Sequence, residues 1–338
     1  MSASAPTLPS GTVALPRRGE SVLAPEFSSI AFALFIVFMP WEWVRGDEFA
    51  ALVNYTTRIY ALRDYGMRAF QWEDTVMGWL KFEYLWFALL TFVAKMNVEP
   101  KVFLSTVTFV SAFFTHRFLR HYTGALLAAL VLTNPITIDL VSSQVRSALA
   151  FSLFLALVGA GNSGRFVWLR WTAMLALPFI HTAMAMVLAI FAGAKVLTVL
   201  PRLSPVMRSV LIASGALVMV FVIATFLPAL ADEAGDRRQL ADYGNKTAAY
   251  VMFWLLLGIA LVASASRRNA DSWEYAFATF ITLFGSLAEF LSLPGFRFVA
   301  LAIPVIFAAM PLMKKELRDG SIVMTACYGG LLVYYWVR

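Results

Sequence analysis

Two ionisable residues, Arg146 and His181, lie at the edges of runs that are otherwise apolar enough for a lipid environment. An arginine near the centre of a bilayer costs roughly 2.5–3.5 kcal/mol on insertion scales. An ionisable residue in such a run is therefore, by default, the sign of a functional site. The segment 139–187, which holds both residues, predicts a polar site inside a membrane-embedded enzyme or transporter.

The composition defines the class of protein that must position these residues. Of the 338 residues, 60% are hydrophobic and only 14% are charged, whereas soluble domains carry about 25% charged residues. The net charge of +7 comes from small basic groups between apolar runs. This distribution fits basic cytoplasmic loops of a membrane protein and does not indicate a nucleic-acid partner.

The apolar runs predict an all-α, polytopic integral membrane protein. Because a bilayer core needs about 20 apolar residues per helix, long continuous runs predict spanning helices rather than strands of a barrel. The strongest runs are 26–44, 102–118, 122–139, 209–227, 247–265, 274–293, 296–313 and 321–337. With the shorter runs included, we expect about 10–12 transmembrane or re-entrant helices.

The N-terminal segment 1–25 is rich in Pro, Ser and Gly and is predicted to be a disordered cytoplasmic tail. The remaining residues, 26–338, are predicted to form a single transmembrane domain. The first apolar run lacks a small-residue cleavage site, so it is interpreted as an uncleaved span.

Basic residues predict the topology through the positive-inside rule. Five clusters are assigned to the cytoplasm: Arg117/Arg120, Arg165/Arg170, Lys195/Arg202/Arg208, Arg267/Arg268 and Lys314/Lys315/Arg318. This assignment requires 83–95 not to cross the membrane and 166–194 to return as two halves broken at Pro178. The alternative makes each of these segments one span, which moves Arg117 and Arg120 outside and Arg146 inside.

In the favoured topology several polar elements face the periplasm and outline one cavity. These elements are the long loop 45–82, the turn at Arg146, the break from Pro178 to His181, the loop 228–246 and the turn 294–297. The loop 45–82 has apolar residues at helical spacing and is predicted to form amphipathic helices on the membrane surface.

Five short elements resemble the EpsG/Wzy-type family of polysaccharide polymerases. They are GDEFAALVNY (46–55), FEYLW (82–86), VRSALA (145–150), IHTAMAM (180–186) and GFRF (295–298). Members of that family often show a Gly-x-Asp-x-x-x-Tyr element, an acidic residue opening the next apolar stretch, Arg-x-x-x-Ala, a His before small residues, and a late Arg-aromatic pair. The resemblance covers about 46–312 and implies a membrane glycosyltransferase fold of the GT-C type.

The resemblance implies glycosyl transfer from a polyprenyl-pyrophosphate-linked oligosaccharide onto another lipid-linked unit at the periplasmic face of the bacterial inner membrane. Arg146 and Arg297 would bind the pyrophosphate, because a guanidinium stays charged and donates two parallel hydrogen bonds. His181 would take or relay the acceptor proton, since imidazole titrates near neutral pH. Asp47, Glu48 or Glu83 would orient a sugar hydroxyl or act as the base instead.

Each of these residues also has a structural interpretation. Arg146 could anchor a helix end or pair with Asp139, and His181 could be a packing residue beside the Pro178 break. Asp47 could cap a helix. The remaining alternatives are a structural Glu289–Arg297 pair, a solvated loop around Arg237 and Arg238 in place of lipid-linked phosphate binding, and ordinary surface positions for His116 and His121.

Other chemistries lack their residues in this sequence. Three scattered histidines and one cysteine supply no zinc-ligand spacing, although carboxylates alone could hold Mg²⁺, and no phosphate-binding loop for ATP is present. We therefore expect no metal and no cofactor. Membrane lipid and proteins of polysaccharide assembly and chain-length control are the expected partners. The competing functions are a lipid-linked sugar flippase or transporter and a membrane-bound O-acyltransferase.

Overall fold

The computed structural model describes residues 23–66, 75–81, 83–159, 167–200, 203–234, 248–267, 269, 271–291, 293 and 295–337. All of the elements in these ranges are helical, as the composition predicts. The first part of the chain forms α1 (Leu23–Phe38), α2 (Trp41–Arg45), α3 (Ala50–Tyr65), α4 (Val76–Lys81), α5 (Tyr84–Lys95), α6 (Pro100–Thr123), α7 (Ala125–Leu132) and α8 (Pro135–Ser142).

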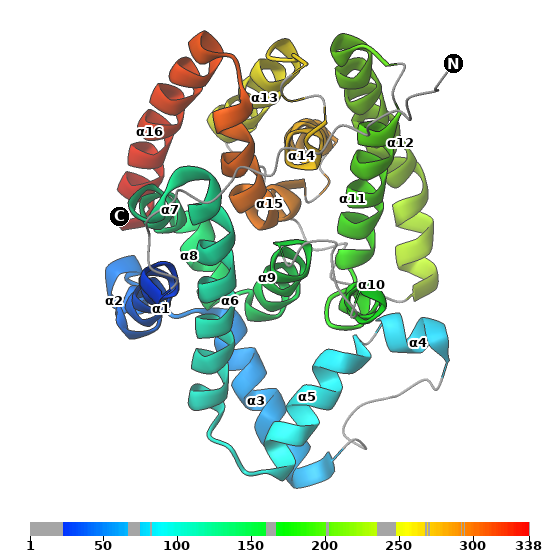
Figure 1. The fold of residues 1–338 in the computed structure, drawn as a ribbon. Coiled ribbons are helices and arrows are strands. Elements are labelled where there is room, and N and C mark those ends of the chain that lie inside the picture. The colour runs from blue at the N-terminus through cyan, green and yellow to red at the C-terminus, as the bar shows by residue number, and fades with distance from the viewer. Residues whose placement is uncertain are drawn as a thin grey trace, which may run out of the picture.

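The second part begins with α9 (Val145–Gly159), α10 (Val167–Ala176), the 3-10 helix η2 (Leu177–Phe179) and α11 (Met184–Val199). It continues with α12 (Pro205–Ala234), α13 (Ala248–Ala263), α14 (Trp273–Phe290), α15 (Gly295–Ala309), the 3-10 helix η4 (Met310–Leu312) and α16 (Lys315–Val337). Figure 1 shows α14 in the middle of the bundle, with α3, α4 and α5 together below it.

Four of the described helices are long and apolar enough to cross a membrane: Pro100–Thr123, Pro205–Phe226, Gly295–Leu312 and Lys315–Val337. A fifth candidate is the pair α7 and α8, if the two helices form one span. Shorter apolar helices of 10–17 residues add to these, among them α5, α9, α11 and α13. The long apolar helices indicate a multi-pass membrane protein.

Prolines interrupt two of the runs that the sequence predicts as continuous spans. The run 26–44 is divided, because α1 ends at Phe38 and α2 begins after Pro40. The run 122–139 is divided between α7 and α8, which are bent by 78°. The second break occurs where Asn134 caps α8 and Pro135 occupies its first turn, which is a strong helix-start signal.

Other predicted boundaries also differ from the observed helices. The loop predicted for 228–246 is helical up to Ala234 in α12, and the tail predicted for 1–25 is helical from Leu23. The loop 45–82 contains α3 and α4, so its helical character is confirmed. The break predicted at Pro178 is confirmed as well, because η2 separates α10 from α11.

Two buried apolar clusters hold the helices together. The larger cluster is centred on α14, where the Gly285 and Gly295 backbones of α14 and α15 approach too closely for a side chain. The smaller cluster joins α3, α5 and the first half of α6 to Val145 and Leu149 of α9. The smaller cluster fixes the start of α9 against α5, and Arg146 lies at that contact.

Several predicted basic clusters meet at one end of the bundle, which we call the basic end. It contains the C-terminal half of α6, Lys195 of α11, Arg208 of α12, the start of α14 and Lys314. Tyr122 donates a 2.7 Å hydrogen bond to Glu274, and the Lys195 ammonium lies 5.8 Å from the Trp273 ring centroid. The Lys314 backbone N–H donates to Ser264 at 2.5 Å.

Candidate functional site

Glu83 is a buried carboxylate in the turn that precedes α5. It has a φ of 53°, in the left-handed region that non-glycine residues rarely adopt, and it occupies the N-cap position of α5. The residue is only 5% exposed. Trp86 and Phe87 on the following turn pack into the smaller apolar cluster and hold the start of α5 in place. Backbone strain of this kind persists where the surrounding packing over-determines it.

Both oxygens of Glu83 are occupied by groups from distant parts of the chain. The Arg146 guanidinium forms an ion pair with Oε2 through Nη1. Oε1 accepts from the Thr182 backbone N–H at 3.1 Å and from the Thr182 hydroxyl at 3.0 Å, and it lies 2.7 Å from His181 Nδ1. We call Glu83, Arg146, His181 and Thr182 the Glu83 centre.

Local sequence determines how each partner reaches Glu83. Arg146 lies in the first turn of α9, whose neighbours Val145 and Ser147 are buried. His181 and Thr182 lie in the turn between η2 and α11, where Pro178 interrupts the helix. A helix interruption leaves backbone N–H groups without a helical partner. The Thr182 N–H is such a group, and it donates to Glu83.

The electrostatics of the centre favour an ionised carboxylate. Burial opposes the charge on Glu83, but the hydrogen bond with His181 and the positive charge of Arg146 outweigh it. Together they hold the pKa of Glu83 below its ordinary value. Glu83 lies outside the candidate spans.

The centre leaves specific atoms of its cations available for other ligands. The Glu83 carboxylate lies at Nδ1 of His181, so Nε2 is the ring nitrogen that Glu83 does not engage. The Nε atom of Arg146 is a buried donor that has no hydrogen-bond partner among the described residues. Both side chains are 18% exposed, whereas that of Glu83 is 7% exposed. The centre therefore offers an imidazole and a guanidinium that share one anchoring acid.

The predicted pair Glu289 and Arg297 lies elsewhere, at the junction of α14 and α15. Glu289 Oε1 accepts a 2.8 Å hydrogen bond from the backbone N–H of Phe296. Arg297 is exposed, and its guanidinium lies 5.9 Å from the Phe296 ring centroid. Glu289 thus supports the start of α15 through the backbone.

Asp47 and Glu48 are exposed residues in the short turn between α2 and α3. The helix-cap interpretation of Asp47 is wrong, because Phe49 occupies the N-cap position of α3 and no side chain caps it. Arg237 and Arg238 lie outside the described residues.

Two structural alternatives from the sequence are also corrected. Asp139 does not anchor Arg146: it pairs at 3.5 Å with Arg45, while Arg146 pairs with Glu83. His116 is not a surface residue, because α6 continues to Thr123 and places His116 inside the bundle at 1% exposure. There its ring nitrogens contact Ser29 at 3.0 Å and the Ala125 carbonyl at 3.1 Å. His121 is exposed, as predicted.

Thr182 is the member of the Glu83 centre that the sequence analysis did not identify. Its signal was its position directly after His181 at a helix break, where hydroxyl side chains commonly bond to neighbouring polar groups. The sequence identified Glu83 as an acid opening an apolar stretch but did not pair it with Arg146 or His181. No group of three His, Cys, Asp or Glu residues in the described ranges could hold a metal ion.

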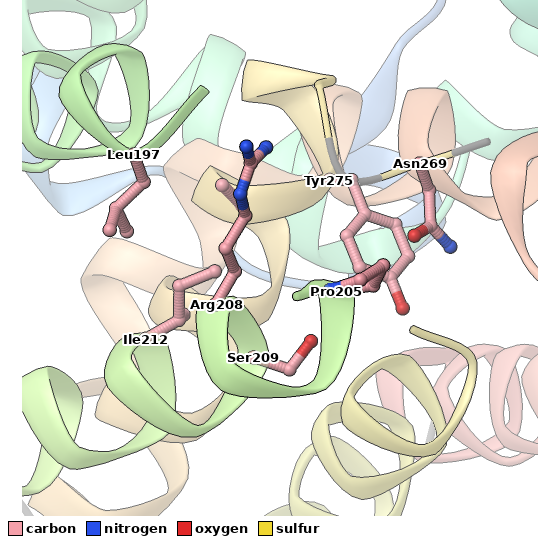
Figure 2. Close-up of a pocket in the computed structure, with 8 residues that line it drawn as sticks. Leu197, Pro205, Arg208, Ser209, Ile212, Asn269 and Tyr275 are labelled. Atoms are coloured by element: carbon pink, nitrogen blue, oxygen red, sulfur yellow. The ribbon is translucent and has the colours of Figure 1, made fainter. Parts of the chain in front are cut away.

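A small pocket at the basic end is separate from the Glu83 centre. Arg208 and Ser209 of α12 line it together with Asn269 and Tyr275, as Figure 2 shows. Arg208 is held by a 2.8 Å contact with Asp271 and by a 2.7 Å hydrogen bond to the Leu200 carbonyl. These contacts give Arg208 a structural role between α11, α12 and α14.

Comparison of the chain with protein-family models, curated proteins and solved structures finds no match.

Proposed function

We propose that the protein is a membrane polysaccharide polymerase of the EpsG/Wzy type with a GT-C-like architecture. It would transfer a polyprenyl-pyrophosphate-linked oligosaccharide onto the sugar end of another lipid-linked repeat unit. The observation that carries this proposal is the Glu83 centre, where one buried carboxylate holds both a guanidinium and an imidazole. An anion-binding group and a proton-accepting group are what glycosyl transfer from a pyrophosphate needs.

The proposed reaction assigns a role to each member of the centre. A hydroxyl oxygen of the acceptor attacks the anomeric carbon of the donor, and the bond from that carbon to the pyrophosphate oxygen breaks. The leaving pyrophosphate takes the bonding electrons, and Arg146 stabilises its charge. His181 Nε2 takes the hydroxyl proton, while Glu83 accepts from Nδ1 and so orients the ring.

Glu83 acts in this scheme as a positioning residue rather than as the base or a sugar ligand. Its oxygens are already engaged by Arg146, His181 and Thr182. Holding the guanidinium and the imidazole in a fixed geometry lowers the entropy cost of reaching the transition state. Arg297, Asp47 and Glu48 would contribute further contacts to the two lipid-linked substrates, as would Glu289, Arg237 and Arg238.

The topology supports a site on the periplasmic side of a bacterial inner membrane. The positive-inside rule assigns the basic end to the cytoplasm. Arg146 lies in the first turn of α9, and His181 and Thr182 lie just before α11 begins. The basic residue Lys195 lies near the C-terminal end of α11. Because α11 runs from the centre toward Lys195, this assignment would put the Glu83 centre on the periplasmic side.

The proposed reaction uses no nucleotide and no metal, and its partners are lipid-linked glycans and proteins of chain-length control. A membrane-bound O-acyltransferase is the second candidate, because an imidazole oriented by a carboxylate also suits acyl transfer. A lipid-linked sugar flippase would use the cations without the proton-transfer group.

The direct test is an assay of purified protein in liposomes with polyprenyl-pyrophosphate oligosaccharide and EDTA. We expect a ladder of longer lipid-linked glycans without added nucleotide sugar. A requirement for a nucleotide-activated donor contradicts the proposal. Transbilayer movement without a new glycosidic bond favours a flippase, and transfer from an acyl donor favours the acyltransferase.

Arg146→Lys tests the guanidinium within the same assay. Lysine keeps the charge but cannot form the two-pronged phosphate contact, so we expect the rate to fall roughly 10²–10³-fold. The matched control is Arg117→Lys, a half-exposed arginine that pairs with Glu26 at 3.1 Å away from the Glu83 centre. Equal rates for Arg146→Lys and wild type, at equal protein levels, would reduce Arg146 to a structural cation.

A further inference from the structure

Three aromatic side chains with polar tips meet where α16 packs against α13. The ring centroids of Tyr250 and Trp254 of α13 are 6.2 Å apart. The ring centroid of Tyr328 of α16 lies 6.3 Å from that of Tyr250 and 6.2 Å from that of Trp254. Thr325 precedes Tyr328 by three positions, so it lies on the same face of α16. We call these four residues the α13–α16 cluster.

The polar atoms of the α13–α16 cluster are buried without hydrogen-bond partners. Four of them are enclosed and form no hydrogen bond with the described residues: Trp254 Nε1 and the hydroxyls of Tyr250, Thr325 and Tyr328. Trp254 as a whole is only 3% exposed. Its N–H lies near both tyrosine hydroxyls, but neither contact reaches hydrogen-bond geometry. Four such groups in one place are unfavourable, because each has lost its hydrogen bonds to water without replacement.

An aromatic belt at the membrane surface does not explain the α13–α16 cluster. Tyrosine and tryptophan residues of such a belt place their polar tips among the headgroups and water. The polar tips of this cluster are enclosed instead. The unpaired groups therefore indicate a ligand that supplies hydrogen bonds between α13 and α16.

The donors and acceptors of the α13–α16 cluster fit an uncharged ligand that carries hydroxyl groups. The indole N–H only donates, whereas each of the three hydroxyls donates and accepts. None of the four side chains carries a charge at neutral pH. The negative charge of Glu289 acts on Tyr250, which disfavours an anionic ligand. A sugar meets these requirements, because its hydroxyls both donate and accept and its C–H groups pack on aromatic rings.

The position of α16 favours a sugar that is attached to a lipid. Figure 1 shows α16 at the edge of the bundle, and Ser321 is the only residue of this helix that is buried. Within one turn of the cluster, Met252 and Leu256 of α13 and Ile322 and Leu331 of α16 are exposed. Acyl chains would cover these apolar side chains while the sugar enters between the helices. Entry requires α16 to shift outward, which its peripheral position permits.

We propose that the α13–α16 cluster is a binding site for the sugar headgroup of a glycolipid. The Trp254 N–H and the three hydroxyls form hydrogen bonds with hydroxyls of the sugar. The exposed apolar side chains of α13 and α16 contact the acyl chains. None of the four residues belongs to the Glu83 centre, and binding does not depend on the reaction proposed for that centre.

The first test compares lipid retention by the full-length protein in native mass spectrometry, using glucosyl-diacylglycerol and diacylglycerol with identical acyl chains. An amine-oxide detergent is used, because a sugar detergent would compete for the site. Wild type should retain glucosyl-diacylglycerol preferentially. Tyr250→Phe and Tyr328→Phe each remove one hydroxyl and keep the ring, so each should reduce that preference roughly 2–10-fold. The matched control Tyr335→Phe changes an exposed tyrosine of α16 and should leave the preference unchanged.

Thermal unfolding distinguishes a ligand site from a structural role of the hydroxyls. Without glycolipid, Tyr250→Phe and Tyr328→Phe should unfold at or above the wild-type temperature, because each substitution removes a buried hydroxyl that has no partner among the described residues. Added glucosyl-diacylglycerol should raise the unfolding temperature of each variant less than that of wild type.

Three results would overturn the glycolipid site. One is an unchanged preference for glucosyl-diacylglycerol in both phenylalanine variants, each verified as folded by its helical circular dichroism. Another is a lower unfolding temperature of both variants without glycolipid, which would show that the hydroxyls already have partners. The third is displacement of glucosyl-diacylglycerol by equimolar methyl glucoside, which would identify a soluble sugar as the ligand. The two variants change different helices, so misfolding of one leaves the other as the test.

Discussion

The Glu83 centre and the basic end both place charges inside an apolar protein, but they compensate these charges differently. At the Glu83 centre an enclosed carboxylate accepts from a guanidinium, a backbone N–H and a hydroxyl, with an imidazole nitrogen in contact. At the basic end the compensation is partial: Lys195 rests on aromatic rings, and the Asp271 partner of Arg208 is 78% exposed. Burial of the acid thus distinguishes the two regions.

This difference predicts how strongly each region depends on its individual residues. An enclosed ion pair is costly to break, because the remaining charge stays buried without compensation. A pair with one partner in solvent is weak, because water replaces the lost contact. Single substitutions should therefore have large effects at the Glu83 centre and small effects on the Arg208–Asp271 pair.

Glu83→Gln should give the largest loss of stability. The substitution removes the negative charge while the Arg146 guanidinium stays only 18% exposed, and breaking a buried pair in this way costs about 3–5 kcal/mol. Thermal unfolding in detergent micelles measures the loss. The matched control is Glu48→Gln, which changes an exposed acid and should leave the unfolding temperature close to wild type.

The double variant Glu83→Gln/Arg146→Met separates the ion pair from simple loss of packing. It removes the cation as well as its partner, so it should be more stable than Glu83→Gln alone. Equal stability of the two variants would contradict this explanation, because the unpaired Arg146 charge would then contribute nothing to the stability lost in Glu83→Gln.

The loss of stability at acid pH should also depend on Glu83. Because the folded state lowers the pKa of Glu83, its contribution is complete above the ordinary pKa of glutamate. That contribution is lost as the pH falls through the lowered value of the folded state. Unfolding temperatures measured from pH 7 to pH 3 should fall less steeply for Glu83→Gln than for wild type. Parallel curves would show that another carboxylate controls acid unfolding.

Features of the Glu83 centre that depend on local sequence could be predicted. An arginine and a histidine at the edges of apolar runs, an acid opening an apolar stretch, and a break at Pro178 are visible in the sequence. The convergence of Arg146 and His181 on Glu83 could not be predicted, since His181 and Glu83 are 98 positions apart. Their contact depends on how the smaller apolar cluster packs α3 and α5 against α9.

The fold, too, could be predicted only where local sequence determines it. Helical character follows from continuous apolar composition, and the break at Pro178 follows from the chemistry of proline. Hydropathy alone did not locate the break at Asn134–Pro135, because α7 before it is uniformly apolar and α8 after it is still apolar on average; the signal for the break is the Asn-Pro pair itself. The burial of His116 could not be predicted from the assignment of the neighbouring Arg117 and Arg120 to the cytoplasm, because α6 continues past them to Thr123.

Asp271→Asn should have the smallest effect and tests the other half of the comparison. The substitution removes the charge that contacts Arg208 at 2.8 Å, yet Arg208 keeps its 2.7 Å hydrogen bond to the Leu200 carbonyl. Because the side chain of Asp271 is 78% exposed, water and salt already screen the pair, and the loss should stay below about 1 kcal/mol. Thermal unfolding of Asp271→Asn beside Glu83→Gln, at low and high salt, measures the difference. A loss for Asp271→Asn as large as that for Glu83→Gln would show that exposure of the acid does not determine how much an ion pair contributes to this protein.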